Sequence, residues 1–306
     1  MTFSVHPSAE AVSRALIARI LQVAAETSGV VNIALSGGST PALLFRLWAS
    51  EYADATPWER LRFFWADERC VPPDDPQSNF GMTKRTLLDH APIAPEQVFR
   101  IRGEADPSAE ALRCTAEAAR LVPARCDSEE RLRTEAPCGS GEVAPAAVPC
   151  GSGEVVPAAV PCGSGEVVPA AVPCGSGEVV PAAVPCGSGE VVPAAERTPQ
   201  FDIVLLGIGE DGHTASIFPG QEALLSAPQT YAVAVHPESG QRRITLTGRP
   251  LLQAARLFFL VCGSPKAEVL ADLYASPDAG PAAFVAHNAR HTVEIFADAD
   301  AAALLP

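Results

Sequence analysis

The order of apolar and polar positions predicts a chain in which helices and strands alternate. Residues 8–27 carry apolar side chains every three or four positions, which predicts a helix that ends before Gly29. Unbroken apolar runs at 30–35 and 201–207 predict buried strands. Further strands are expected at 61–69, 231–236, 243–247, 256–262 and 291–297, and further helices at 41–50, 78–90, 108–121 and 265–274. This alternation predicts an α/β fold, a mainly parallel sheet with helices on both faces.

A tandem repeat interrupts this pattern. Five units of twelve residues, beginning PCGSGEV, occupy residues 137–196. They are rich in proline, glycine, alanine and serine and contain no aromatic residue, so they offer little surface to bury against the entropy of the chain. We therefore expect one domain, residues 1–122 and 200–306, interrupted at 123–199 by a low-complexity, flexible insertion. A stacked solenoid or a binding arm is the alternative.

Composition narrows the possible partners. The formal net charge is −14, which disfavours nucleic acid and anionic membranes as partners. Five of the nine cysteines recur once per repeat, without a histidine, so no metal site is expected. The first residues lack the pattern of a signal peptide, and no apolar stretch reaches the length of a membrane span. We expect a cytoplasmic protein, a monomer or weak oligomer.

The strongest candidate site follows the strand at 201–207. The chain breaks there into three glycines, and Asp211 and His213 lie among and after them. A carboxylate and an imidazole at the carboxyl end of a central strand indicate acid–base chemistry. The glycines also match the spacing of a dinucleotide-binding loop, although Glu210 and Asp211 would place negative charge beside a pyrophosphate. A further alternative is that both side chains only cap a turn.

A second candidate loop follows the strand at 30–35. Its residues are Ser36, Gly37, Gly38, Ser39 and Thr40. Glycines, hydroxyls and the free amides of a helix that opens at Pro41 suit a phosphate monoester, and the missing lysine excludes a nucleotide P-loop. The alternative is an ordinary capped turn.

Four charged residues elsewhere are candidates for the same site. Arg243 and Lys266 could complete a phosphate pocket, or could be solvated surface charges. Asp67 and Arg69 end the strand at 61–69 and could be functional or a structural ion pair.

Six segments in order resemble the 6-phosphogluconolactonase family, which shares a superfamily with glucosamine-6-phosphate deaminase. They are SGGSTP at 36–41, WADERCVP at 65–72, SNFGM at 78–82, FDIVLLGIGEDGHTASIFPG at 201–220, RRITLTGRPL at 242–251 and GSPKAEVL at 263–270. The resemblance implies hydrolysis of a sugar-phosphate lactone, 6-phospho-D-glucono-1,5-lactone, to 6-phosphogluconate without a cofactor or metal. The repeat is the departure from the family pattern.

The resemblance also implies roles for the candidate residues. His213 would be the general base, with Asp67, Arg69 and Asp211 around it, and the loop at 36–40 would hold the phosphate together with Arg243 and Lys266. Direct attack by water suits the sequence, because no serine lies in a G-x-S-x-G elbow. A deaminase would need an acid in the segment 214–219, which has none. A non-catalytic sugar-phosphate-binding protein remains a second alternative.

Overall fold

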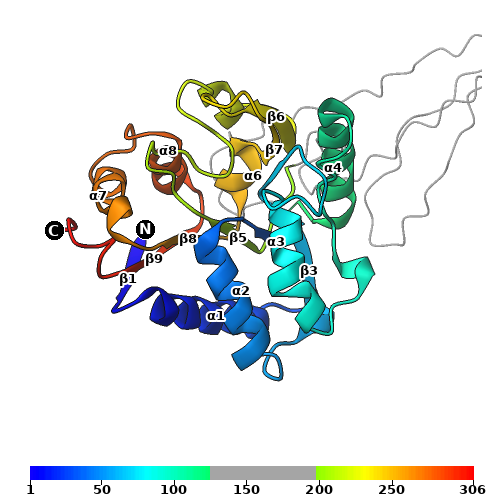
Figure 1. Ribbon diagram of the computed structural model, residues 1–306, viewed down its shortest axis with the longest axis horizontal. Helices are drawn as coiled ribbons and strands as arrows, with labels where there is room; N and C mark the ends of the chain where they lie inside the picture. The colour runs from blue at the N-terminus through cyan, green and yellow to red at the C-terminus, as the bar shows by residue number, and fades with distance from the viewer. Residues whose placement is uncertain (125–197) are drawn as a thin grey trace, which may run out of the picture. The chain divides into compact units, whose positions relative to one another are not determined.

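The computed structural model describes residues 1–124 and 198–306 (Figure 1). The repeats at 137–196 lie outside the described residues, so the flexible insertion remains a prediction. On the described side of each boundary, the backbone N–H of Gln200 donates to the carbonyl of Pro123 at 3.1 Å. The chain therefore leaves the described fold and returns to it at one place.

A six-stranded parallel sheet forms the centre of the fold. Its strands are β1 (Thr2–His6), β2 (Val31–Leu35), β3 (Leu61–Trp65), β5 (Ile203–Leu206), β8 (Arg256–Val261) and β9 (Thr292–Asp298). Their order is β1-β9-β8-β5-β2-β3, and each neighbouring pair is parallel. Every residue of β2 and β5 is buried, as the unbroken apolar runs predict for strands covered on both faces.

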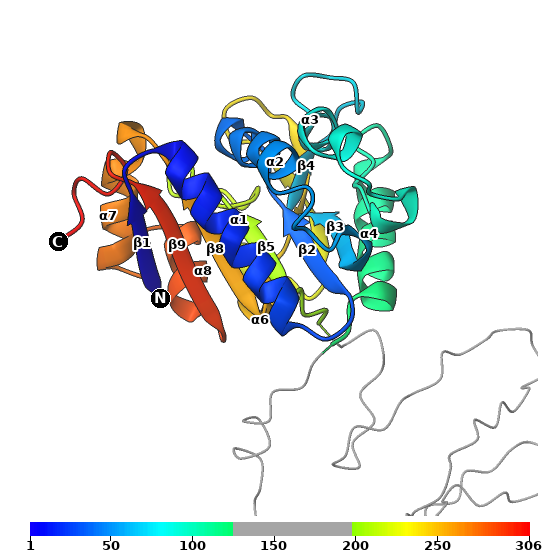
Figure 2. The same cartoon turned by 90° about the horizontal axis from the view of Figure 1, so that it is seen from below.

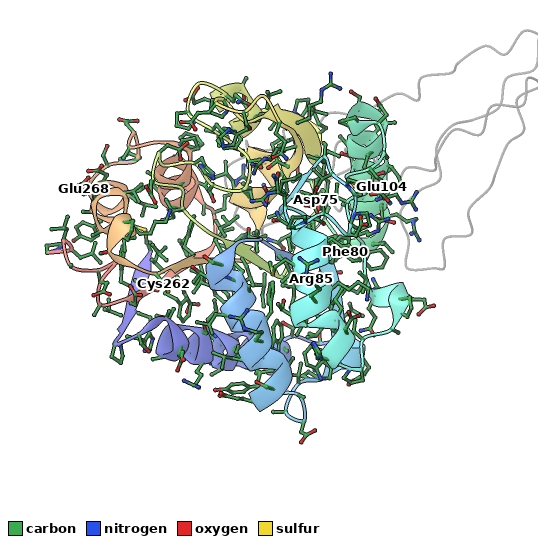
Figure 3. The ribbon with its side chains drawn as sticks, viewed as in Figure 1. Asp75, Phe80, Arg85, Glu104, Cys262 and Glu268 are labelled. Atoms are coloured by element: carbon green, nitrogen blue, oxygen red, sulfur yellow. The ribbon has the colours of Figure 1, made fainter. Side chains whose placement is uncertain are left out.

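Helices cover this sheet. The α-helices are α1 (Ala9–Glu26), α2 (Ser39–Glu51), α3 (Asn79–Thr86), α4 (Pro107–Leu121), α6 (Gly248–Gln253), α7 (Ala267–Ala275) and α8 (Pro281–Asn288). Short 3₁₀ helices are η1 (Trp58–Arg60), η2 (Leu88–His90), η3 (Pro95–Gln97), η5 (Glu222–Leu225) and η6 (Ser264–Lys266). Figure 2 shows α1 crossing one face of the sheet, with α6 and α8 behind it. Side chains fill the space between these layers (Figure 3). The predicted α/β fold with a mainly parallel sheet is confirmed.

The predicted strand at 61–69 is in fact two strands in different sheets. β3 ends at Trp65, and β4 (Asp67–Arg69) joins a three-stranded antiparallel sheet with β7 (Arg242–Leu246) and β6 (Tyr231–Val235). The change occurs at Ala66, whose N–H donates to Leu35 of the large sheet while its carbonyl accepts from Leu246 of the small one. The sequence pattern also missed β1 and α8.

No helix within residues 1–124 and 198–306 is long and apolar enough to cross a membrane.

Candidate active site

A histidine–aspartate pair lies in the loop after β5. His213 Nδ1 is 2.5 Å from Asp211 Oδ1, which also accepts the backbone N–H of His213 at 3.2 Å. A carboxylate can only accept, so Nδ1 carries the proton and Nε2 keeps its lone pair as a base. Partial burial raises the pKa of Asp211, but the charge and hydrogen bonds of His213 outweigh it, and the pKa lies below its ordinary value. Asp211 therefore stays ionised and accepts the Nδ1–H of His213.

Two glycines permit the geometry of this loop. A Cβ on Gly209 would lie 2.1 Å from His213 Nδ1 and 2.4 Å from Asp211 Oδ1, so a side chain there would displace the pair. Gly212 adopts a φ of 79° and its carbonyl accepts the N–H of Ala282 in α8. The glycines thus bring the imidazole close to the backbone and fasten the loop to α8.

The chain after this loop does not form the helix that a dinucleotide-binding loop requires. Thr214 instead bridges to Ile217 in a tight turn, and its hydroxyl donates to the carbonyl of Gly207 at 2.9 Å. The dinucleotide alternative lacks the helix N-terminus on which a pyrophosphate would rest.

A buried phenylalanine supports the histidine. The ring of Phe218, 1% exposed, lies 4.7 Å from the ring of His213 and 5.0 Å from that of His236, measured between centroids. The guanidinium of Arg243 lies 5.8 Å from the same ring. One aromatic side chain therefore contacts both the candidate base and a candidate phosphate ligand, two residues that sequence reasoning had connected only by resemblance.

Two arginines lie side by side in the small antiparallel sheet. Arg69 of β4 pairs in register with Arg243 of β7. Burial lowers the pKa of Arg243, and the positive charge of Arg69 lowers it further. The Nε of each arginine is buried without a hydrogen-bond acceptor among the described residues, although Arg69 Nη1 donates to the carbonyl of Gln77 at 2.7 Å. Two adjacent cations with unused donors are suited to an anionic oxygen.

The loop at 36–40 leads into α2 as predicted. Gly38 is the N-cap with a φ of 114°, and no hydrogen bond ties the hydroxyls of Ser39 and Thr40 to the described chain. The amides of this helix terminus can therefore receive an anion. Ser36 differs, because its hydroxyl donates to the carbonyl of Leu205 at 2.8 Å and joins the loop to β5.

Asp67 connects three parts of the site instead of contacting the histidine. Its carboxylate, 4% exposed, accepts the hydroxyl of Ser216 at 2.6 Å and the amide of Asn79 at 3.1 Å. The Asn79 side chain occupies the place where a Cβ on Gly37 would lie, at 1.8 Å from Oδ1. Among the described residues, Asp211 is the carboxylate that bonds to the His213 ring, and Asp67 joins the loop at 36–40 to the segment after His213. Sequence reasoning missed Asn79 and Ser216, although both lie inside quoted motifs.

Glu68 holds the start of α3. Its carboxylate accepts the backbone N–H groups of Arg69, Asn79 and Phe80 at 2.7–2.8 Å and the hydroxyl of Ser78 at 3.0 Å. Burial raises the pKa of Glu68, and these hydrogen bonds offset burial only in part. The carboxylate thus fixes the helix that carries Asn79.

Lys266, in η6 after β8, lies beside the histidine loop. Its Nζ is 3.9 Å from Glu210 Oε1, and its side chain is 26% exposed. This distance is too long for a hydrogen bond, so the ammonium can turn toward another anion. Within the described ranges, the structure contains no group of three or more His, Cys, Asp or Glu side chains that could hold a metal ion.

Comparisons with known proteins identify the family of this chain. The family model described as "Glucosamine-6-phosphate isomerases/6-phosphogluconolactonase" matches residues 7–133 and 180–294. A Treponema pallidum protein named 6-phosphogluconolactonase is 33% identical over 254 residues, which cover 83% of this chain and 76% of the relative. A Haemophilus influenzae protein of the same name is 31% identical, with 85% and 81% covered. The crystal structure of a devB protein, 32% identical, covers 100% of this chain and 99% of its own with a TM-score of 0.72. This chain belongs to the glucosamine-6-phosphate isomerase/6-phosphogluconolactonase family.

Proposed function

We propose that this chain hydrolyses 6-phospho-D-glucono-1,5-lactone to 6-phosphogluconate. The observation that carries the proposal is a histidine base, oriented by Asp211, whose supporting ring also contacts one of two adjacent arginines with unused donors. The curated relatives above carry the name of this activity.

The reaction is direct attack by water. Nε2 of His213 takes a proton from water as the oxygen bonds to the lactone carbonyl carbon, and Asp211 stabilises the imidazolium that forms. The carbonyl π electrons move to oxygen, where a guanidinium such as that of Arg69 stabilises the developing charge. Collapse of this intermediate breaks the bond to the ring oxygen, and His213 returns the proton to that oxygen. The products are a carboxylic acid, which ionises, and a free hydroxyl.

The phosphate remains outside this chemistry and positions the ring. We assign it to Arg243, Lys266 and the α2 terminus with Gly38, Ser39 and Thr40, all of which present donors suited to a dianion. Gly37 and Ser36 shape the loop, since one contacts Asn79 and the other bonds to β5. Asp67 acts as a positioning residue through Ser216 and Asn79.

The deaminase activity that shares this family is disfavoured by the segment after the histidine. Residues 214–219 carry no acid for ring opening. Their side chains have other uses in the fold: Ser216 donates to Asp67, and Phe218 packs against His213.

A lactonase assay on the purified protein, corrected for spontaneous hydrolysis, tests the proposal. His213→Ala should lower kcat about a hundredfold or more, the usual scale for a positioned base, and change KM little. His90→Ala is the matched control, because this exposed histidine lies in η2 and bonds only to the carbonyl of Arg85. Wild-type protein without activity would leave a sugar-phosphate-binding protein as the function. Near-normal turnover by His213→Ala would mean that the base is another residue.

A further inference from the structure

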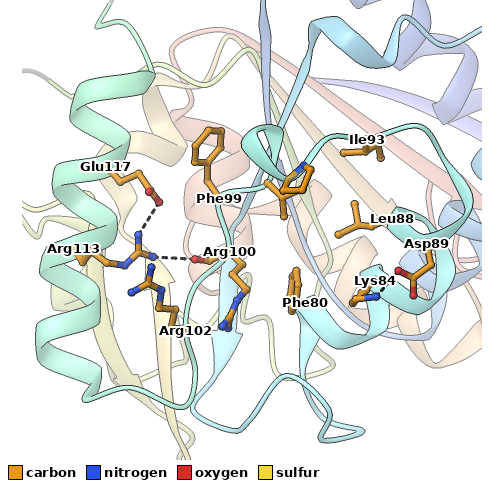
Figure 4. A pocket seen from close by; sticks show the side chains of 12 residues that line it. Phe80, Lys84, Leu88, Asp89, Ile93, Phe99, Arg100, Arg102, Arg113 and Glu117 are labelled. Atoms are coloured by element: carbon orange, nitrogen blue, oxygen red, sulfur yellow. Dashed lines mark hydrogen bonds and ion pairs between the residues drawn. The ribbon is translucent and has the colours of Figure 1, made fainter.

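A cavity lies away from the residues assigned to catalysis. It has a volume of about 480 Å³ and lies between α3–η2 and α4 (Figure 4). This volume is in the range of small-molecule sites. None of the residues that line it belongs to the histidine loop, the loop at 36–40 or the arginine pair.

One side of the cavity is apolar and firmly supported. Leu88 and Ile93 lie on the η2 side of the cavity, and Phe80 and Phe99 lie between them and α4 (Figure 4). The ring of Phe99 stacks on Phe64 at 4.8 Å. The backbone N–H of Phe99 also donates to the edge strand β3 at 2.8 Å. This wall is therefore preformed and offers flat and aliphatic surface to a ligand.

The other side is basic. Figure 4 shows Arg100, Arg102 and Arg113 gathered next to α4. Arg100 donates to both carboxylate oxygens of Glu104, at 3.0 and 2.6 Å, and its guanidinium lies 5.2 Å from the Phe80 ring.

The guanidinium of Arg113 is also held by hydrogen bonds, whereas that of Arg102 is not. Arg113 donates to Glu110, to Glu117 and to the carbonyl of Arg100. The backbone of Arg102 is fixed by its N–H, which donates to Glu110 at 2.8 Å. Its guanidinium has no acceptor among the described residues. Since Lys84 is paired with Asp89, Arg102 is the lining cation left for a ligand.

We propose that this cavity binds a small molecule that joins a flat aromatic ring to one anionic group. The ring lies against the apolar wall and the guanidinium plane of Arg100, which aromatic surfaces favour. The anion accepts from Arg102, which presents a planar fork of donors. A bare inorganic anion would leave the apolar wall uncovered, and a neutral ring would leave Arg102 without an acceptor.

Calorimetric titration with three probes tests both halves of the ligand. A naphthalenesulfonate carries the ring and the charge, naphthol carries the ring alone, and inorganic sulfate carries the charge alone. The naphthalenesulfonate should bind at one site at least about tenfold more tightly than either of the others, because it alone makes both the ring contact and the charged hydrogen bond. Equal affinity for naphthol and naphthalenesulfonate would overturn the proposal.

Substitutions test whether the naphthalenesulfonate binds in this cavity. Arg102→Gln should weaken the naphthalenesulfonate about tenfold, while Arg120→Gln, on the same helix as Arg113 but outside the cavity, should not. Ile93→Trp, which fills the cavity, should abolish binding. Lactonase activity shows that each variant is folded. Unchanged affinity in Arg102→Gln, or loss of binding when 6-phosphogluconate saturates the catalytic site, would contradict a separate site.

Discussion

At the scale of single residues, one missing side chain allows the His213–Asp211 pair to form. Gly209 leaves the space in which His213 Nδ1 and Asp211 Oδ1 meet, since a Cβ would lie 2.1 and 2.4 Å from these atoms. Gly207, two positions earlier, has no positive φ, and a Cβ added to it would have nothing within 4 Å. The two glycines therefore have different structural roles, although both lie in the same glycine-rich loop of the sequence.

Gly209→Ala should lower kcat about tenfold or more, because a displacement of about 1 Å at a catalytic group is costly, and should leave substrate binding nearly unchanged. Gly207→Ala is the matched control and should keep kcat. Steady-state kinetics of both variants, with melting temperatures to verify folding, make the measurement. Equal effects of the two substitutions would argue that Gly209 serves the loop and not the pair.

The phosphate assignment predicts a different kinetic signature. Lys266→Ala should raise KM about tenfold or more, the value of one charge-assisted hydrogen bond, and reduce the preference for phosphorylated over unphosphorylated lactone. Lys84→Ala removes the only other lysine of the chain and should change neither. A wild-type preference in Lys266→Ala would show that this ammonium does not contact the phosphate.

At the scale of elements, the N-terminus of α3 is hydrogen-bonded to strand β4 beside the candidate site. Glu68 receives four donors there while burial raises its pKa. Ser78 is the N-cap, and its hydroxyl accepts the N–H of Gly81. Asn79 of the same helix donates to Asp67, and Phe80 lines the cavity between α3–η2 and α4. A change at this terminus should therefore shift the position of side chains in the site without removing a group that reacts.

Glu68→Gln should reduce the free energy of unfolding by about 1–3 kcal/mol, because the amide nitrogen would meet backbone donors. The pH dependence has a definite sign. A raised pKa means that the unfolded chain loses this proton first, so stability falls as pH rises from about 4.3 to the raised pKa. The Glu68→Gln variant has no carboxyl group at this position, so it lacks this titration.

The stability advantage of the wild type over Glu68→Gln should thus shrink as pH rises through that interval, measured by urea unfolding. Glu96→Gln, an exposed position, is the control and should track the wild type at every pH. An advantage that grows with pH would mean that the folded state favours the ionised carboxylate.

At the scale of the whole molecule, the site forms where the ends of parallel strands meet the small antiparallel sheet. The loops after β2, β5 and β8 carry residues 36–40, His213 and Lys266, and β4 and β7 carry Arg69 and Arg243. The chain leaves the described fold just after Pro123 and returns to it just before Gln200, and these two residues are hydrogen-bonded to each other.

Excision of residues 137–196, with a short Gly/Ser link in their place, should leave kcat/KM within a few-fold of the full chain and barely alter the melting temperature. Each doubling of a flexible loop costs only about 0.6 kcal/mol, and the repeat sequence offers little apolar surface to a core. Activity and thermal unfolding of the shortened and full chains make the comparison. A large loss of either on excision would favour the solenoid interpretation of the repeats.

The sequence by itself predicted most of the elements and named the candidate residues. The helix predicted at 8–27 is α1, Ala9–Glu26, and the strand predicted at 201–207 is β5, Ile203–Leu206. Local periodicity, caps and glycine breaks carry this information, because they act between residues close in the chain. The histidine and aspartate of the pair are two residues apart, so their meeting was also within reach of a local pattern.

Only the tertiary structure decided which distant side chains act together. Asp67 and Ser216 are 149 residues apart, and the arginine pair depends on the register of β4 against β7. The strand pattern at 61–69 could not reveal the transfer between sheets at Ala66, which depends on partners in β2 and β7. Strand register and long-range hydrogen bonds follow from how the buried faces pack, and a local pattern of apolar residues does not specify its partner.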